Sequence, residues 1–125
     1  MRPLRVRLTR LELQLMDILW DLGTAAVREV QEAIPEKARP AYTTVQTILN
    51  RLEEKGAVRK TKKIGNAWIF EPVITRKKTH QRLIDDFLDV FGGSATPVVS
   101  HLLETGKITL ADLKALEERL GKGKE

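Results

Sequence analysis

The segment from Ala41 to Pro72 constrains this chain most, because a helical pattern runs there directly into a short hairpin pattern rich in lysine and arginine. Four apolar residues follow the i, i+3, i+4, i+7 spacing of a helix that packs on a core: Val45, Ile48, Leu49 and Leu52. The opposite face carries short, uncharged hydrogen-bonding groups: Thr43, Gln46, Thr47 and Asn50, flanked by Thr44 and Arg51. Such groups donate to and accept from base edges, so this face is predicted to read DNA.

A hairpin is predicted after this helix, with strands at Ala57–Lys63 and Ala67–Glu71 and an end at Pro72. Its turn contains Gly-Asn, which can adopt the positive φ of a tight hairpin. Five basic residues near the hairpin have no acidic residue among them: Lys55, Arg59, Lys60, Lys62 and Lys63. Beside a recognition helix, such residues would contact phosphate or the adjacent minor groove.

The helix face and the hairpin together give the predicted DNA-binding residues: Thr43, Thr44, Gln46, Thr47, Asn50, Arg51, Lys60, Lys62, Lys63 and Asn66. Two aromatic residues of the second strand, Trp68 and Phe70, are predicted to be core or packing anchors of the hairpin. Base stacking is the alternative for them, but a stacking surface usually needs several exposed rings.

Composition narrows the classes of function. At 125 residues and 42% hydrophobic, the chain can bury one core, or one core and a small helical appendage. It has no cysteine, which excludes disulfides and thiolate chemistry and fits a reducing cytosol. The basic start of the chain lacks the apolar region of a signal peptide, and no apolar run approaches the roughly 20 residues of a membrane span. We therefore expect a soluble, cytoplasmic protein without membrane insertion.

Basic residues gather in one part of the chain. Residues 1–82 hold 17 of the 22 lysines and arginines against 9 acidic residues, a net charge of +8, whereas residues 83–125 have a net charge of −3. A basic region concentrates phosphate at its surface and gains sequence-independent affinity by counterion release. The alternative, that basic residues only keep the surface soluble, predicts that both signs mix along the chain.

The chain is expected to divide at about residue 80, with a winged-helix domain at 1–74 and a helical dimerisation region at 75–125. The predicted fold class is mostly α with a small β-hairpin wing. Three short helices, of which the last has a polar N-terminal face, are the layout of a helix-turn-helix.

Local signals delimit these first helices. Thr9-Arg-Leu-Glu12 is a capping box, so a helix should begin at about Arg10 and end at Gly23. Its predicted core stripe is Leu11, Leu15, Ile18, Leu19 and Leu22. A second helix should run from about Val27 to Pro35, and a third should run from Tyr42 to about Lys55.

The second part of the chain is predicted to hold three more helices. The first begins at Thr75 or Thr79 and ends before Gly92-Gly93, Pro97 suits the first turn of the next, and Thr109-Leu-Ala-Asp112 resembles a capping box. These helices carry more apolar side chains than so short a segment can bury, whereas two copies can share a core. The predicted dimerisation residues are Leu83, Phe87, Phe91, Val99, Leu102, Leu103, Leu113, Leu116 and Leu120. The alternative is a monomer in which these helices fold back on the winged helix.

The sequence resembles the penicillinase-repressor family of winged-helix transcriptional repressors over about residues 8–120. The strings that carry the resemblance are Leu11-Glu-Leu, Leu19-Trp20, Val27-Arg-Glu-Val30, Ala41-Tyr-Thr-Thr-Val-Gln-Thr-Ile-Leu-Asn-Arg-Leu-Glu-Glu-Lys-Gly56, Phe91-Gly-Gly-Ser94 and Ser100-His-Leu-Leu103. The resemblance implies a bacterial, dimeric repressor on a double-stranded DNA operator, with DNA-facing residues at Thr43, Thr44, Gln46, Thr47 and Arg51. It also implies a membrane sensor-protease as a partner that inactivates the repressor.

The chain departs from the family pattern in three places. Members regulated by copper end in paired cysteines, and members released by a β-lactam-activated protease are cut at an Asn-Phe bond; this sequence contains neither. The inducing signal therefore does not follow from the resemblance. Arg76, Lys77 and Lys78 stand where acids are usual, although basic residues are unfavourable at a helix N-terminus. We expect that this segment lies near DNA phosphate, or that the helix starts later, at Thr79.

No constellation of residues indicates catalysis, so we expect neither an enzyme nor a metal or cofactor. His80 and His101 have no carboxylate or second histidine at ligand spacing, and Ser100 cannot form a triad with its neighbour His101. A solvated helix face explains the acidic residues of the second part: Asp85, Asp86 and Asp89.

Two hypotheses of different classes follow. The first is a sequence-specific transcriptional repressor that binds an inverted-repeat operator as a homodimer, and the second is a protein–protein adaptor that uses the same winged helix. The polar helix face and the basic hairpin favour the repressor, because an adaptor should expose aromatic or aliphatic anchors there.

Overall fold

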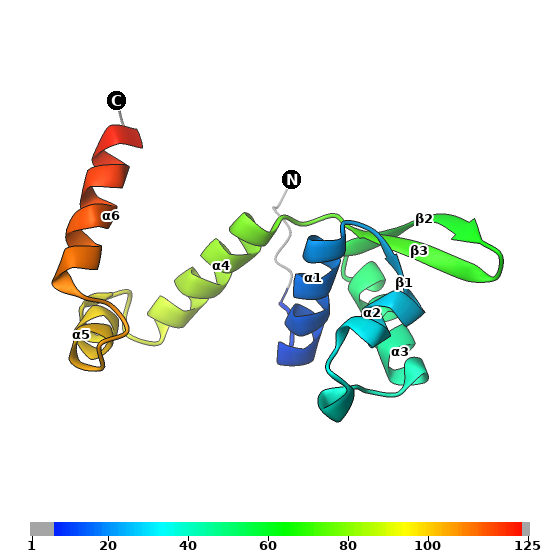
Figure 1. The fold of residues 1–125 in the computed structure, drawn as a ribbon. Helices are drawn as coiled ribbons and strands as arrows, with labels where there is room; N and C mark the ends of the chain where they lie inside the picture. The colour runs from blue at the N-terminus through cyan, green and yellow to red at the C-terminus, as the bar shows by residue number, and fades with distance from the viewer. Residues whose placement is uncertain (1–6, 124–125) are drawn as a thin grey trace. The chain divides into compact units, whose positions relative to one another are not determined.

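The computed structural model describes residues 7–123, so the first six residues, on which the expectation of no signal peptide rests, and residues 124–125 lie outside it. The chain forms two compact units that meet between His80 and Gln81. Its elements (Figure 1) are α1 (Arg10–Leu22), β1 (Ala25–Ala26), α2 (Val27–Ala33), the 3-10 turn η1 (Glu36–Ala38), α3 (Tyr42–Glu54), β2 (Val58–Ile64), β3 (Ala67–Pro72), α4 (Arg76–Asp89), α5 (Thr96–Glu104) and α6 (Leu110–Gly123). This mostly helical architecture with a small antiparallel sheet confirms the predicted fold class.

The sheet of the first unit has three antiparallel strands in the order β1-β3-β2. β2 and β3 form the predicted hairpin, in which Gly65 has a φ of +59° and Asn66 does not adopt a positive φ. The sequence does not predict β1, because two alanines show no strand pattern. β1 exists because β3 offers it a free edge, where Ala25 pairs with Phe70 and Ala26 pairs with Ile69.

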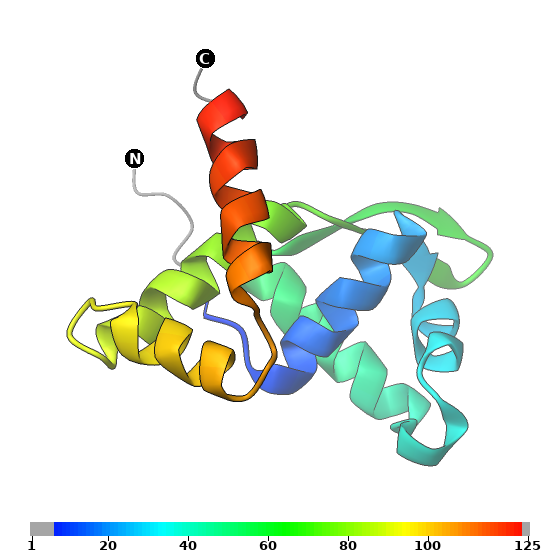
Figure 2. The same cartoon turned by 60° about the vertical axis from the view of Figure 1, so that its left-hand side comes forward.

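One hydrophobic core holds α1, α2, α3 and the base of the sheet together, and α1 lies beside α3 in both views (Figures 1 and 2). The predicted apolar stripe of α3 is buried, as is Phe70 of β3. Leu22, predicted for the core stripe of α1, is 47% exposed, and Trp68, predicted as a core residue or a packing anchor of the hairpin, is 42% exposed and so is not a core residue. Leu22 is the last residue of α1, and Trp68 pairs with Lys63 close to the hairpin turn.

A buried carboxylate joins the start of α1 to the end of α3. Glu12 is 3% exposed, and its Oε1 accepts hydrogen bonds from the Thr9 backbone N–H at 2.8 Å and from the Lys55 ammonium at 2.6 Å. The Thr9 hydroxyl accepts from the Glu12 N–H at 3.1 Å, which completes the predicted capping box. Burial alone would raise the pKa of Glu12, but hydrogen bonds from Lys55 and Thr9 outweigh burial and lower the pKa below its ordinary value.

The first turn of α4 is tied to α1. The Trp20 indole N–H donates to the Ile74 carbonyl at 2.9 Å, and the Arg76 guanidinium lies 5.3 Å from the centroid of the indole ring. Arg76 also donates to the Asp17 carbonyl at 3.0 Å and to the Asp21 carboxylate at 2.8 Å. The positive charge of Arg76 at the helix start is therefore balanced by the acids of α1, whereas the expectation that this segment lies near DNA phosphate stays a prediction.

Helix α4 begins at the earlier of its two predicted starts. The Thr75 hydroxyl accepts from the Lys78 backbone N–H at 3.2 Å, which is the hydrogen bond of an N-cap. The two compact units divide inside this helix, between His80 and Gln81, close to the expected division at about residue 80, whereas the predicted domain ranges 1–74 and 75–125 assign all of α4 to the second part.

The second unit consists of the rest of α4 together with α5 and α6. Gly92 and Gly93 have φ values of +66° and +85°, and Pro97 lies in the first turn of α5, as predicted. Thr109 and Asp112 exchange hydrogen bonds of 3.0 and 3.1 Å between side chain and backbone, which confirms the capping box before α6. No side chain between residues 81 and 122 is buried in the single chain.

Replacing Glu12 with glutamine tests the charge that links α1 to α3. Glutamine can still cap α1, but it removes the ion pair with Lys55, so we expect the free energy of unfolding at pH 7 to fall by about 1–3 kcal/mol. Because the folded-state pKa of Glu12 is lowered, its contribution is complete above the unfolded-state pKa of about 4.3 and is lost as pH falls through the lower folded-state value. Urea unfolding at a series of acidic pH values should therefore show a smaller loss of stability in Glu12→Gln than in the unaltered protein.

Glu29→Gln is the matched control. Glu29 accepts from the Ala26 N–H at 2.8 Å in an exposed capping interaction at the start of α2, and it makes no ion pair within residues 7–123. We expect this variant to change the unfolding free energy by less than about 0.5 kcal/mol and to leave its pH dependence unaltered. Equal losses in the two variants would contradict the role of the ion pair.

Candidate nucleic-acid interface

The predicted polar face of α3 is exposed to solvent, on the side opposite the core. Five of its residues are exposed and Asn50 is half-buried; the exposed residues are Thr43, Thr44, Gln46, Thr47 and Arg51. The first turn of α3 contains no acidic residue, so the positive end of the helix dipole is not neutralised by its own side chains. This face offers hydrogen-bonding groups together with a favourable potential for an anion.

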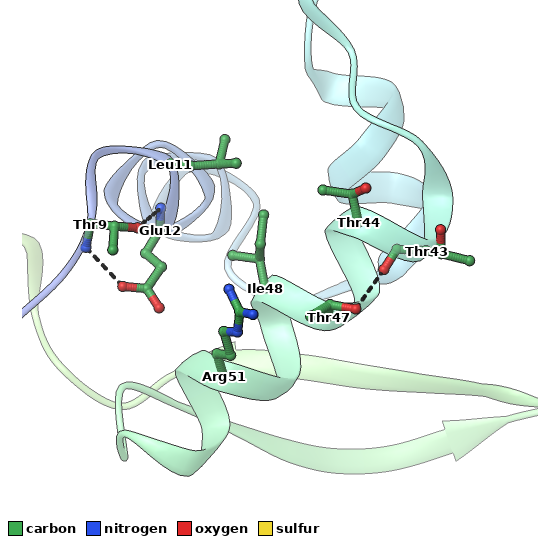
Figure 3. A pocket seen from close by; sticks show the side chains of 8 residues that line it. All are labelled: Thr9, Leu11, Glu12, Thr43, Thr44, Thr47, Ile48 and Arg51. Atoms are coloured by element: carbon green, nitrogen blue, oxygen red, sulfur yellow. Dashed lines mark hydrogen bonds between the residues drawn. The ribbon is translucent and has the colours of Figure 1, made fainter.

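The two threonines one turn apart on this face are coupled. The Thr47 hydroxyl donates to the Thr43 carbonyl at 2.9 Å, as Figure 3 shows. Its proton is therefore used inside the helix, which leaves the oxygen free to accept and the methyl group free for apolar contact. In this state Thr47 suits an amino group or a thymine methyl group of a base pair.

The turn between α2 and α3 is held by side-chain hydrogen bonds. Arg39 donates to the carbonyls of Ile34 and Glu32, both at 3.0 Å, at the end of α2 where helix carbonyls lack partners in the helix. Gln31 of α2 donates to the Pro40 carbonyl at 3.1 Å, just ahead of α3. These hydrogen bonds hold the start of α3 in a fixed position relative to α2, as expected for a recognition helix, whose side chains must meet base edges in a defined geometry.

An open depression of about 350 Å³ lies between the start of α1 and the exposed face of α3 (Figure 3). Its lining comes from both helices: Thr9, Leu11 and Glu12 from α1, and Thr43, Thr44, Thr47, Ile48 and Arg51 from α3. The start of α1 thus borders the predicted interface, which the sequence did not indicate. The capping box located Thr9 along the chain but gave no sign that α3 would lie beside it.

Arg28 is not among the predicted DNA-binding residues, but it contacts the start of α3. Its guanidinium lies 5.2 Å from the centroid of the Tyr42 ring, in the first turn of α3. No local spacing signals this pair, because the two residues belong to different helices that only the fold brings together.

The five basic residues near the wing are not equivalent. Three of them have acidic partners: Lys55 pairs with Glu12, Arg59 pairs with Glu71, and Lys60 pairs with Glu53 at 3.4 Å. These three cations are therefore partly neutralised by the protein itself, which their spacing in the sequence could not reveal.

Two lysines of the wing keep their charge available. Lys62 and Lys63 are exposed, and neither forms an ion pair in the part of the chain that the structure describes. Asn66, at the hairpin turn, is also exposed. The structure places these three residues together at the end of the wing, where β2 turns into β3.

The histidines and acidic residues that were not expected to be catalytic form no metal-binding cluster among the described residues. His80 is not isolated: its ring meets the edge of Trp20 with centroids 5.9 Å apart, and its Nε2 lies 3.9 Å from the Asp17 carboxylate. Among residues 7–123, no three side chains of histidine or acidic residues cluster as metal ligands. None of the described helices combines the length and the apolar character needed to cross a membrane.

Comparison with known proteins assigns the chain to a family. A profile of the family described as "Penicillinase repressor" matches residues 8–122. The chain is similar to the penicillinase repressor of Bacillus licheniformis, with 26% identity over 119 residues, 91% of this chain and 92% of that protein. A solved structure titled "CopR Repressor Structure" is 30% identical and covers 56% of this chain and 100% of its own, with a TM-score of 0.46.

The family match extends over nearly all of the described residues and includes both compact units. The chain therefore belongs to the penicillinase repressor family, and it is a DNA-binding transcriptional repressor and not an enzyme.

Proposed function

We propose that the protein represses transcription as a homodimer on an inverted-repeat operator, with α3 reading base edges and the wing holding phosphate. The observation that carries this proposal is the exposed, uncharged polar face of α3 beside wing lysines that have no ion pair in the described chain. Uncharged groups distinguish bases, whereas lysines supply affinity that does not depend on sequence.

Each predicted DNA-binding residue has a role in this proposal. Base edges are contacted by Thr43, Thr44, Gln46, Thr47 and Asn50, with Arg51 at the border of the face. Phosphate or the minor groove is contacted by Lys60, Lys62, Lys63 and Asn66. Since Lys60 is paired with Glu53, we expect it to contribute less to DNA binding than Lys63 does.

The apolar surface of the second unit supports the homodimer. Large side chains that remain exposed in the single chain include Ile84, Phe87, Val90, Phe91, Leu110, Leu116 and Leu120. Phe87 of α4 and Phe91, two residues beyond the end of α4, pack edge to face, with ring centroids 5.1 Å apart. A second copy related by a two-fold axis would cover such a surface and would present two reading helices to two half-sites.

Because the proposed target is an operator on bacterial DNA, the protein would act in the cytoplasm. A membrane sensor-protease as the inactivating partner belongs to the same proposal, and since the sequence has no Asn-Phe bond, such a protease would have to cut elsewhere.

A protein–protein adaptor is the competing function, and the exposed Trp68 and Ile64 on the wing are the observation in its favour. The two functions differ in their response to salt. If the logarithm of the affinity for random duplex DNA falls linearly with the logarithm of the salt concentration, the repressor is supported. If the protein does not bind duplex DNA at low salt, the adaptor is supported.

Gln46→Ala tests the readout. We expect a loss of about 1–3 kcal/mol on the operator, selected beforehand from a random duplex pool, and little change on random DNA, because a base contact is lost and no phosphate contact is lost. Gln14→Ala, which removes another exposed helical glutamine, should leave both affinities unchanged. If Gln46→Ala weakens operator and random DNA equally, α3 does not read bases through this residue.

Lys62→Ala and Lys63→Ala test the wing. Each variant should weaken all duplexes similarly and lower the slope of log affinity against log salt by about one unit, since one phosphate contact releases about one counterion. Lys114→Ala on α6 removes an exposed lysine of the second unit and serves as the control. A slope that is the same in all three variants and in the unaltered protein would exclude the wing from the interface.

Phe87→Asp tests the dimer. A charge in place of one ring of the Phe87–Phe91 pair should convert the protein to a monomer in light scattering and should weaken operator binding, because two linked half-sites then bind as separate ones. Val73→Asp makes the same change at an exposed apolar residue of the first unit and should leave the dimer intact. A Phe87→Asp protein that still scatters as a dimer would contradict the proposed interface.

A further inference from the structure

An irregularity in the wing decides which lysines share a face. The pairing of β2 with β3 shifts register at Thr61, so that Lys60 lies opposite Phe70 and Lys63 lies opposite Trp68. In a regular strand, residues three apart point to opposite faces of the sheet. The extra residue in β2 is a β-bulge, and it places Lys60 and Lys63 on the same face, the one that carries Trp68 and Phe70.

Trp68 lies within reach of both of these lysines. The ammonium nitrogens of Lys60 and Lys63 lie 5.3 and 5.5 Å from the centroid of its ring, within the range of a cation–π contact. The indole is nevertheless 42% exposed, so it is not part of the core. An exposed tryptophan near the tip of a hairpin thus has two cations as its neighbours.

The two lysines differ in their other contacts. Lys60 also lies 6.0 Å from the centroid of the Phe70 ring and 3.4 Å from the Glu53 carboxylate of α3, so it connects the wing to the reading helix. Lys63 has no acidic partner among the described residues, and its ammonium remains open to an anion. Lys62 lies opposite Ile69, on the other face of the hairpin.

We propose that Trp68 is a positioning residue that orders Lys60 and Lys63 before DNA binds, so that Lys63 meets a backbone phosphate at a reduced entropic cost. The inference rests on the proposed function of the wing. A free lysine loses considerable rotamer freedom when its ammonium is fixed on a phosphate. The indole restricts that freedom in advance, and because it contacts one side of the ammonium, the remaining N–H groups stay available as donors.

The first test needs no DNA. An indole ring moves the NMR resonances of protons above its face upfield, so the side-chain methylene protons of Lys60 and Lys63 should be shifted relative to those of Lys62 in the full-length protein. Trp68→Leu should abolish the shift, and Trp68→Phe should keep part of it. Equal resonances for the three lysines would overturn the inference, whatever the protein does with DNA.

The second test is a double-mutant cycle on random duplex DNA. Trp68→Leu alone should weaken binding about two- to tenfold, and Trp68→Phe should restore most of the loss, because the aromatic face returns. In the Trp68→Leu background, Lys63→Ala should cost less than it does in the unaltered protein. Lys62→Ala should cost the same in both backgrounds, which makes it the matched control within the same strand.

The outcomes separate the inference from the proposed function. If the unaltered protein binds duplex without any dependence on salt, or does not bind, the proposed function is wrong. If it binds with a salt dependence and the effects of Trp68→Leu and Lys63→Ala are additive, the inference is wrong and the function stands. Ile64→Ala removes another exposed apolar side chain of the wing and should leave affinity unchanged; a loss equal to that of Trp68→Leu would assign the effect to apolar contact and overturn the inference.

Discussion

The buried carboxylate of Glu12 is the interaction on which the first unit depends, because it serves two helices at once. It accepts the backbone N–H that α1 leaves unpaired at its start, and it neutralises the lysine that follows the end of α3. A carboxylate in a buried position is costly unless its hydrogen bonds are complete, so the position of Lys55 is constrained as strongly as that of Thr9. The direction in which α3 presents its polar face is thereby linked to the first turn of α1.

Helix ends were predictable from the sequence because their signals are local. Two capping boxes pair backbone N–H groups at helix starts with side chains three residues away: Thr9 with Glu12, and Thr109 with Asp112. Proline has no backbone N–H, so Pro97 leaves no such group unpaired in the first turn of α5. What could not be predicted depends on residues far apart. β1 exists only as a partner of β3, and the bulge at Thr61 follows from the fit of two strands and not from the composition of either. Trp68 is exposed although Phe70 on the same face is buried, because Trp68 lies nearer the hairpin turn.

In the candidate site, too, the features that depend on local sequence were predictable and those that depend on packing were not. The polar face of α3 follows from helical periodicity, which needs no knowledge of the rest of the chain. The charge of the wing could not be predicted in this way, because a sequence shows how many basic residues are present but not which of them pair with acidic residues of the protein. Thr9 and Leu11 border the α3 face through packing between α1 and α3, and no spacing in the sequence marks them as part of an interface. The net charge of +8 over residues 1–82 already subtracts these acids, but it does not show which lysines and arginines they neutralise.

Helix α4 runs without interruption through the boundary between the two compact units. A flexible linker would absorb an added or lost residue, but a helix converts it into rotation. One residue inserted after His80 would turn everything that follows by about 100° and move it about 1.5 Å along the axis. For the proposed homodimer, insertions or deletions within α4 would therefore change the spacing and phase of the two half-sites, without altering α3 or the wing.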